Sequence, residues 1–212
     1  MTRINMGCGD SPIDGWENFD NSFSVWLARH SLLASIFCRF LPIQNRKFVE
    51  FARQKGIRYC NATRIPVSDG TATAIFSSHM LEHLDRTQAE HFVREAFRVL
   101  APAGVLRITV PDLDEQISLY TKYRDADRFM RHTMLGREDA NGTRARLKHL
   151  LFGDRAHLWM YNNQSLSALM TAAGFASVQP APQGKTAIHE SGKLDLQWRE
   201  EGSITVEGIK PS

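Results

Sequence analysis

The amino-acid sequence predicts an α/β fold in which helices flank a mainly parallel sheet, and two observations carry this prediction. Short apolar runs of strand character alternate with stretches of helical periodicity along the 212 residues, a pattern that gives parallel strands with right-handed crossovers. The first strand, at residues 4–6, runs directly into Gly7-Cys8-Gly9, and a second strand, at residues 16–19, ends on Asp20. At this length we expect one domain, residues 1–212, with a sizeable core.

The glycine turn and the acid that follows it indicate a nucleoside-binding site. Glycine lets the backbone turn tightly and leaves no side chain between the main chain and a ligand, and a carboxylate at the carboxyl end of a strand can accept bonds from ribose hydroxyls. The dinucleotide pattern needs a third glycine and an acid about 20 residues further on. Here Pro12 and Ile13 stand in place of that glycine, and Asp20 comes eleven residues after Gly9. The spacing argues against a pyrophosphate and favours S-adenosylmethionine, with an ordinary βαβ turn as the alternative.

Composition and cysteine content describe a cytoplasmic globular protein. The chain is 42% hydrophobic and 23% charged, and its net charge of +3 requires neither nucleic acid nor membrane as a partner. Cys8, Cys38 and Cys60 lie far apart and form no C-x-x-C pair, which suits a reducing compartment and predicts neither a disulfide framework nor a zinc site. Because the first strand begins by residue 3, we expect no uncleaved signal peptide.

Residues 22–55 are predicted to be helical in two pieces, broken at Pro42. The first piece has an apolar face at helical spacing with Arg29, His30 and Arg39 between the apolar residues. One interpretation is a helical lid that packs on the sheet or closes over the site. The other is a basic amphipathic helix, at residues 22–41, that touches a membrane surface; it is too interrupted by charge to span one.

The rest of the chain continues the alternation of strands and helices. Asp85 and Gln88 predict a capping box at the start of a helix that Pro102 and Gly104 end, and Gly174 is predicted to close a later helix. Between residues 124 and 155, eight basic residues face five acidic ones, an excess of three positive charges. The expected elements are strands at 57–60, 73–78, 105–110, 175–178 and 204–206, a helical insertion at 113–160, a helix at 163–173 and a loop at 180–202.

Six motifs carry a resemblance to a known family: NMGCG at 5–9, GWENFD at 15–20, SSHMLEHL at 77–84, RVLAPAGVL at 98–106, HLWMY at 157–161 and REEGS at 199–203. In these the chain resembles the class I S-adenosylmethionine-dependent methyltransferases, and among them the small bacterial enzymes associated with surface-polysaccharide clusters. The resemblance implies a Rossmann-like, seven-stranded sheet whose last strand is antiparallel, and a role in polysaccharide biosynthesis. Two departures are Asn5 and Asn61, at positions where many members carry an acid; an amide oxygen can still accept the bond from the adenine amino group.

On this resemblance the cofactor site is built from the glycine turn and from the residues that follow the second, third and fourth strands. The predicted S-adenosylmethionine-binding residues are Asn5, Met6, Gly7, Cys8, Gly9, Asp20, Asn21, Asn61, Ala62, Thr63 and Ser78.

Three histidines are the catalytic candidates. His79 directly follows the fourth strand and is the first choice for a general base that accepts the proton of a hydroxyl acceptor; His83 and His157 are the competitors. Glu82 can orient an imidazole, or Glu82 and His83 simply form a helix start. The H-x-x-E-H pattern at 79–83 also occurs in zinc proteases, but that motif needs one continuous helix and here it straddles a strand exit. Our site prediction includes no metal, with a divalent ion on the same side chains as the alternative.

The acceptor site is predicted from Asp112, Trp159, Tyr161 and Glu190, with core packing as the alternative for the residues at 157–161. Arg and His in the insertion and in the 180–202 loop favour a negatively charged glycan or small molecule, and the aromatics could lie against a sugar ring. The fourth strand is not followed by the Asn/Asp-Pro-Pro-aromatic motif of nucleic-acid amino-methylating enzymes, so no nucleic-acid partner is expected. A small-molecule O- or N-methyltransferase of a natural-product pathway and a non-catalytic cofactor-binding scaffold are the alternatives, and the sequence does not predict an oligomeric state.

Overall fold

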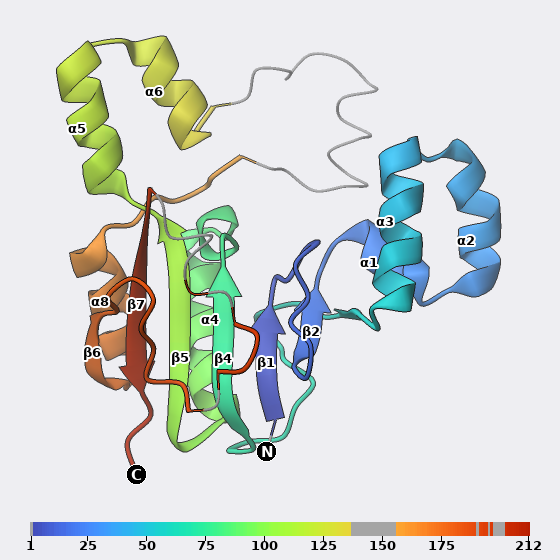
Figure 1. Ribbon diagram of the computed structural model, residues 1–212, viewed down its shortest axis with the longest axis horizontal. Coiled ribbons are helices and arrows are strands. Elements are labelled where there is room, and N and C mark those ends of the chain that lie inside the picture. The colour runs from blue at the N-terminus through green and yellow to red at the C-terminus, as the bar shows by residue number, and fades with distance from the viewer. Residues whose placement is uncertain (1, 137–155, 190, 195, 197–201) are drawn as a thin grey trace.

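The computed structural model describes residues 2–136, 156–189, 191–194, 196 and 202–212. They form a seven-stranded sheet with helices around it (Figure 1). The strands lie in the order β3-β2-β1-β4-β5-β7-β6. Pairing is parallel from β3 through β5, and β7 is antiparallel to both of its neighbours, which confirms the predicted sheet. The strands are β1 Thr2–Met6, β2 Glu17–Asp20, β3 Arg58–Tyr59, β4 Ala72–Ser78, β5 Leu100–Pro111, β6 Ala176–Pro180 and β7 Ser203–Ile209.

The strand order makes the carboxyl ends of β1 and β4 the expected place for a ligand. The chain builds outward from β1 to β2 and β3 and then returns to add β4 on the other side of β1. At such a switch point the connections leave in opposite directions, and ligands bind outside the carboxyl ends of the two strands. Because Met6 pairs with Ser77, the glycine turn and Ser78 both follow at this edge of the sheet.

One face of the sheet is covered by α4 (Arg86–Val99) and α8 (Asn163–Ala172) (Figure 1). Phe92 and Val93 of α4 and Leu166 and Met170 of α8 are fully buried in the main core, at the helical spacing that the sequence predicts. The capping box of α4 is present as predicted from Asp85 and its partner three residues on. Gly174, with φ +102°, directly follows the C-cap of α8 and confirms the predicted stop.

The opposite face of the sheet is covered by loop segments over β4 and β5. Ile13 and Trp16 from the β1–β2 connection, and Ile188 and Leu194 from the loop after β6, pack in a cluster that includes Phe76 of β4. The sequence predicts helices on both faces; the helices surround the sheet, but these loops take the place of a helix over its centre. A layer of loops has no helical periodicity, so the sequence contains no pattern from which it could be predicted, only scattered apolar residues.

The predicted helical region at 22–55 folds as α1 (Phe23–Ala28), α2 (Ser31–Phe37), a 3-10 turn (Cys38–Phe40) and α3 (Ile43–Gln54). The break at Pro42 is confirmed, and a second break near His30 divides the first piece. The helices have their own apolar cluster, which Cys8 and Ile57 join. In Figure 1 they lie beyond the β2 side of the sheet. A role as a lid stays a prediction.

Other boundaries differ from the sequence prediction. Leu100 caps α4 in an extended conformation and already pairs with Ala72, so β5 begins there and Pro102 and Gly104 lie inside the strand. The predicted insertion begins with α5 (Leu113–Tyr123) and α6 (Ala126–Thr133), above the carboxyl ends of the strands in Figure 1. Its residues 137–155 lie outside the described residues. In the described part of the chain, no helix is long and apolar enough to cross a bilayer.

Candidate active site

The glycine turn after β1 is closed by hydrogen bonds to β2. The backbone N–H groups of Gly7 and Cys8 both donate to the Phe19 carbonyl, at 2.8 and 3.0 Å. The N–H of Gly9 donates to Asp20 Oδ2 at 3.1 Å, and the other carboxylate oxygen accepts from the Ser22 N–H at 2.8 Å. The predicted ribose-binding acid therefore also holds the turn in place, and each carboxylate oxygen retains acceptor capacity for a ligand hydroxyl.

The two glycines of the turn have different surroundings. Gly7 (φ +70°) lies under Met80, and a Cβ added there would stand 2.4 Å from Met80 Cγ. Gly9 (φ +52°) faces open space, because an added Cβ would meet nothing within 4 Å. Open space over a turn whose backbone lies at the switch point fits the predicted S-adenosylmethionine site. Met6 and Cys8 are buried, so at this turn they offer a ligand their backbone.

Asn5 has a structural role that explains one departure from the family pattern. Its side chain is buried, and its Nδ2 donates to Asn18 Oδ1 at 2.9 Å and to the Ser11 carbonyl at 3.1 Å. The Asn18 amide in turn bonds the backbone of Ile13 and Trp16. A carboxylate at position 5 would place acceptor against acceptor, so the loop between β1 and β2 requires a donor there.

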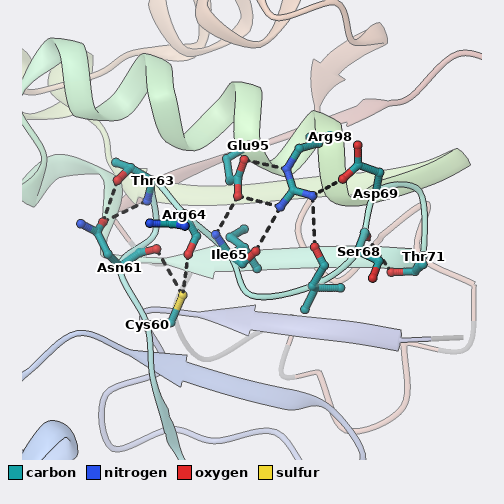
Figure 2. Close-up of polar contacts among 11 residues, drawn as sticks. Cys60, Asn61, Thr63, Arg64, Ile65, Ser68, Asp69, Thr71, Glu95 and Arg98 are labelled. Atoms are coloured by element: carbon teal, nitrogen blue, oxygen red, sulfur yellow. Dashed lines mark hydrogen bonds and ion pairs between the residues drawn. The ribbon is translucent and has the colours of Figure 1, made fainter.

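Asn61 lies at the rim of a groove of about 690 Å³ between the segment after β3 and α4. Its Oδ1 accepts from both the N–H and the hydroxyl of Thr63, at 3.0 Å each (Figure 2). The oxygen that was expected to accept from the adenine amino group is thus already bonded twice, and Nδ2 is the atom that this side chain can still offer as a donor. Ala62 is buried in the core and Asn21 is exposed; their cofactor roles stay predictions.

The segment that carries Asn61 is anchored to α4 by an ion-pair network that the sequence analysis missed (Figure 2). Arg98 binds both oxygens of Glu95, pairs with Asp69 and donates to the Ile65 carbonyl, while Glu95 Oε1 accepts from the Ile65 N–H at 2.8 Å. The hydrogen bond from Arg98 is the main reason that the pKa of Glu95 lies below its usual range. The only sign of this network in the local sequence is the i, i+3 spacing of Glu95 and Arg98 on α4.

His79 stands at the carboxyl end of β4, as predicted, with both ring nitrogens in contact. Its Nδ1 lies 3.2 Å from Glu82 Oε1, and its Nε2 lies 3.3 Å from the Ser203 hydroxyl at the start of β7. The backbone has φ +51° and its N–H donates to the Thr109 carbonyl at 3.0 Å. A non-glycine residue held in this left-handed region is uncommon, and such residues cluster at functional sites. Ser203 lies in the REEGS motif at 199–203, but its contact with His79 spans 124 residues and leaves no signal in the sequence.

Glu82, His83 and His157 gather beside His79. Glu82 and His83 lie in a 3-10 turn, Leu81–His83, so H-x-x-E-H does not lie in one helix and the protease interpretation fails. Glu82 is 1% exposed. His157 Nε2 is 3.9 Å from Glu82 Oε1, and the His83 and His157 rings meet edge to face at 5.0 Å. Burial is the main cause of the lowered pKa of His157, so this imidazole favours the neutral form.

The predicted acceptor residues are divided between surface and core. Trp159 is 45% exposed, with the Arg86 guanidinium 5.9 Å from its ring centroid, whereas Tyr161 is fully buried and burial raises its pKa to about 12. Tyr161 thus fits the core-packing alternative. Asp112 caps α5 by accepting from the Asp114 N–H at 3.0 Å. Glu190 lies outside the described residues. Ser78 is buried at the switch point, and its Oγ has no hydrogen bond among the described residues.

Comparison with known proteins agrees with this geometry. Residues 23–108 match the family model described as a methyltransferase domain; the match spans less than half of the chain and begins after the glycine turn. The comparison with curated proteins gave no match.

Three solved structures share the fold. The first is an S-adenosylmethionine-dependent methyltransferase from Thermotoga maritima described as a possible histamine N-methyltransferase, with a TM-score of 0.53 and 16% identity over 99% of this chain and 82% of that one. The second, from Methanosarcina mazei, has a TM-score of 0.54 and 15% identity over 99% of this chain and 92% of that one. The third, from Archaeoglobus fulgidus, has a TM-score of 0.54 and 13% identity over 99% of this chain and 86% of that one; both are described as S-adenosylmethionine-dependent methyltransferases. At these identities the likeness establishes the fold. The domain match, over residues 23–108, agrees with a methyltransferase fold.

Proposed function

We propose that this chain is an S-adenosylmethionine-dependent methyltransferase that transfers a methyl group to a hydroxyl oxygen of a carbohydrate or glycan-type acceptor, with a role in polysaccharide biosynthesis. The observation that carries the proposal is the arrangement of Glu82, His79 and Ser203 at the carboxyl end of β4. A carboxylate on one side of the imidazole and a hydroxyl on the other is the arrangement by which a histidine takes a proton from an alcohol.

The protonation of His79 follows from its two contacts. The buried carboxylate of Glu82 faces Nδ1 at 3.2 Å, which favours the proton on Nδ1 and leaves the lone pair on Nε2. The Ser203 hydroxyl already stands 3.3 Å from Nε2, so an alcohol can reach this atom. His79 is 35% exposed, which gives an acceptor access to it. His157 faces the same Glu82 oxygen at 3.9 Å but is buried, and His83 Nδ1 faces the Ala156 carbonyl at 3.2 Å, so both fit a supporting role better than that of the base.

The cofactor supplies an electrophilic methyl group on a sulfonium, so the protein mainly positions the acceptor and receives its proton. Nε2 of His79 would take the proton from the acceptor hydroxyl as the oxygen–carbon bond forms and the sulfur–carbon bond breaks, with S-adenosylhomocysteine as the leaving group. Asp20 and the glycine turn hold the nucleoside part. The exposed Trp159 side chain offers an aromatic face to a sugar ring, and the Arg86 guanidinium lies over the Trp159 ring. The positive charge of Arg86 suits a negatively charged sugar; we expect no nucleic-acid acceptor.

This proposal is tested by measuring the turnover and the S-adenosylmethionine affinity of a single variant. His79→Asn removes the proton acceptor, yet asparagine tolerates φ +51° better than alanine or glutamine. With a panel of neutral and phosphorylated sugars, we expect S-adenosylhomocysteine formation by the wild type and a kcat at least about 10²-fold lower for the variant. Calorimetry should give the same S-adenosylmethionine affinity for both.

Three other results would contradict parts of this proposal. If His79→Asn turns over at the wild-type rate, the base lies elsewhere. Turnover only on uncharged phenols or amines would favour the small-molecule methyltransferase of a natural-product pathway. Binding of S-adenosylmethionine without S-adenosylhomocysteine from any acceptor would favour the non-catalytic scaffold, an alternative motivated by the occupied amide oxygen of Asn61. The matched control is His91→Asn, because His91 is exposed on α4.

We also propose that the protein is cytoplasmic and that α2 touches a membrane surface. Leu32 and Ile36 of α2 and Ile43 of α3 are 82%, 58% and 68% exposed. Residues 22–55 contain six Lys or Arg and a single acid, and apolar side chains beside basic ones suit an anionic bilayer. Vesicle flotation tests this: binding should need anionic lipid and should be lost in Leu32→Ser/Ile36→Ser.

A further inference from the structure

The buried carboxylate of Glu82 lacks a partner of the strength that its burial requires. The side chain is 1% exposed, and neither oxygen has a hydrogen bond within the described part of the chain. The contact with His79 at 3.2 Å falls within ion-pair distance but lacks hydrogen-bond geometry, and His157 Nε2 at 3.9 Å is too far for a hydrogen bond. Burial of a carboxylate is unfavourable unless it is paired or coordinates a metal.

Two imidazoles complete a set of metal ligands around this carboxylate. Glu82, His83 and His157 each offer one ligand atom, and the three atoms lie within 4.8 Å of one another. His83 Nδ1 lies 3.2 Å from the Ala156 carbonyl, which places the proton on Nδ1 and leaves the lone pair on Nε2. A backbone carbonyl on the second ring nitrogen is a common way in which proteins orient metal-binding histidines.

We propose that Glu82, His83 and His157 bind a divalent cation of the zinc type, with a fourth position open to water or to an acceptor oxygen. Two histidines and one glutamate are a ligand set of catalytic zinc sites, which keep such an open position. Zinc bonds of about 2.1 Å in a tetrahedral site put ligand atoms roughly 3.4 Å apart. The 3.9 Å separation of His157 Nε2 from Glu82 Oε1 is close to this value, and all three ligand atoms lie within 4.8 Å of one another.

The backbone around the site already connects the two segments that would supply the metal ligands. The Leu158 and Trp159 N–H groups donate to the Glu82 carbonyl at 2.7 and 3.2 Å, so the backbone already joins the 3-10 turn to the segment that carries His157. A bound cation would fasten the same two segments through their side chains. Each carboxylate oxygen has two lone pairs, so Glu82 could bind the cation and still face His79 Nδ1. The proposal departs from our sequence prediction of no metal and is close to the alternative given there, a divalent ion on the side chains of the 79–83 motif. Binding of the ion does not depend on the proposed methyl transfer.

Metal binding is measured directly on the full chain, after removal of bound metals with a chelator. Titration with Zn²⁺ should give one equivalent per chain, and the Co²⁺-loaded protein should show the visible absorption of a four-coordinate ion. His83→Ala changes a half-buried side chain and should fold; Glu82→Gln removes the charge at constant shape. Each should weaken Zn²⁺ binding at least about tenfold and abolish the Co²⁺ spectrum. His91→Ala, which removes an exposed histidine of α4, should bind as the wild type does.

Two results would overturn the site. If Glu82→Gln and His83→Ala bind Zn²⁺ as the wild type does, the metal binds elsewhere. If the wild type binds no stoichiometric Zn²⁺, Glu82 is an ion-pair partner for the histidines only. S-adenosylmethionine affinity, measured on the same preparations, separates the proposals: loss of cofactor binding with metal binding retained refutes methyl transfer and leaves the metal site standing.

Discussion

Alanine substitution of the two glycines in the turn after β1 should give different results although both residues have positive φ. An L-residue in the left-handed region costs about 1–2 kcal/mol, and both variants incur this. At Gly7 the new methyl would lie 2.4 Å from Met80 Cγ, whereas at Gly9 it would meet no atom within 4 Å. Overpacking adds about 1–3 kcal/mol. We therefore expect Gly7→Ala to lose roughly 2–5 kcal/mol of unfolding free energy and Gly9→Ala about 1–2 kcal/mol.

Urea denaturation gives these unfolding free energies from the midpoint and slope, and calorimetry gives the affinity for S-adenosylmethionine. The methyl of Gly9→Ala enters the open space where the cofactor is predicted, so we expect an affinity loss of at least about tenfold, or about 1.4 kcal/mol. Adding Met80→Ala should relieve part of the loss in Gly7→Ala, as a favourable coupling in a double-mutant cycle. Equal stability of the two alanine variants would refute the steric argument, and wild-type affinity of Gly9→Ala would refute the placement of the cofactor.

Two further predictions concern polar groups that hold the loops of the site. Asn5→Asp should lower the unfolding free energy by about 1–3 kcal/mol in urea melts, because the new carboxylate would face the Asn18 amide oxygen at the present 2.9 Å bond; unchanged stability would contradict this role. Because the pKa of Glu95 is lowered in the folded state, mainly by its arginine partner, its contribution to stability should be present above its ordinary pKa and lost as pH falls through the folded value. Melts from neutral to acid pH should fall less steeply for Glu95→Gln, and parallel curves would contradict the assignment.

The sequence by itself determined the elements whose signals are local. The alternation of strands and helices, the capping box at Asp85, the stop at Gly174 and the sequence of strand, glycine turn and Asp20 each depend on residues within a few positions of one another. These features follow from periodicity, backbone conformation and capping chemistry. They were enough to predict the sheet, the class of cofactor and the position of His79.

Only the tertiary structure decided what the side chains of the site contact. Ser203 reaches His79 across 124 residues, and Arg107 pairs with Glu207, inside the sheet, across 100 residues. Both contacts exist because β7 inserts between β5 and β6 and brings residues 203–209 beside β5. Pairings between groups distant in sequence leave no periodic signal, since each partner is fixed by the packing of the whole sheet. For the same reason the burial of Glu82, on which the proposed metal site rests, could not be read from the motif that contains it.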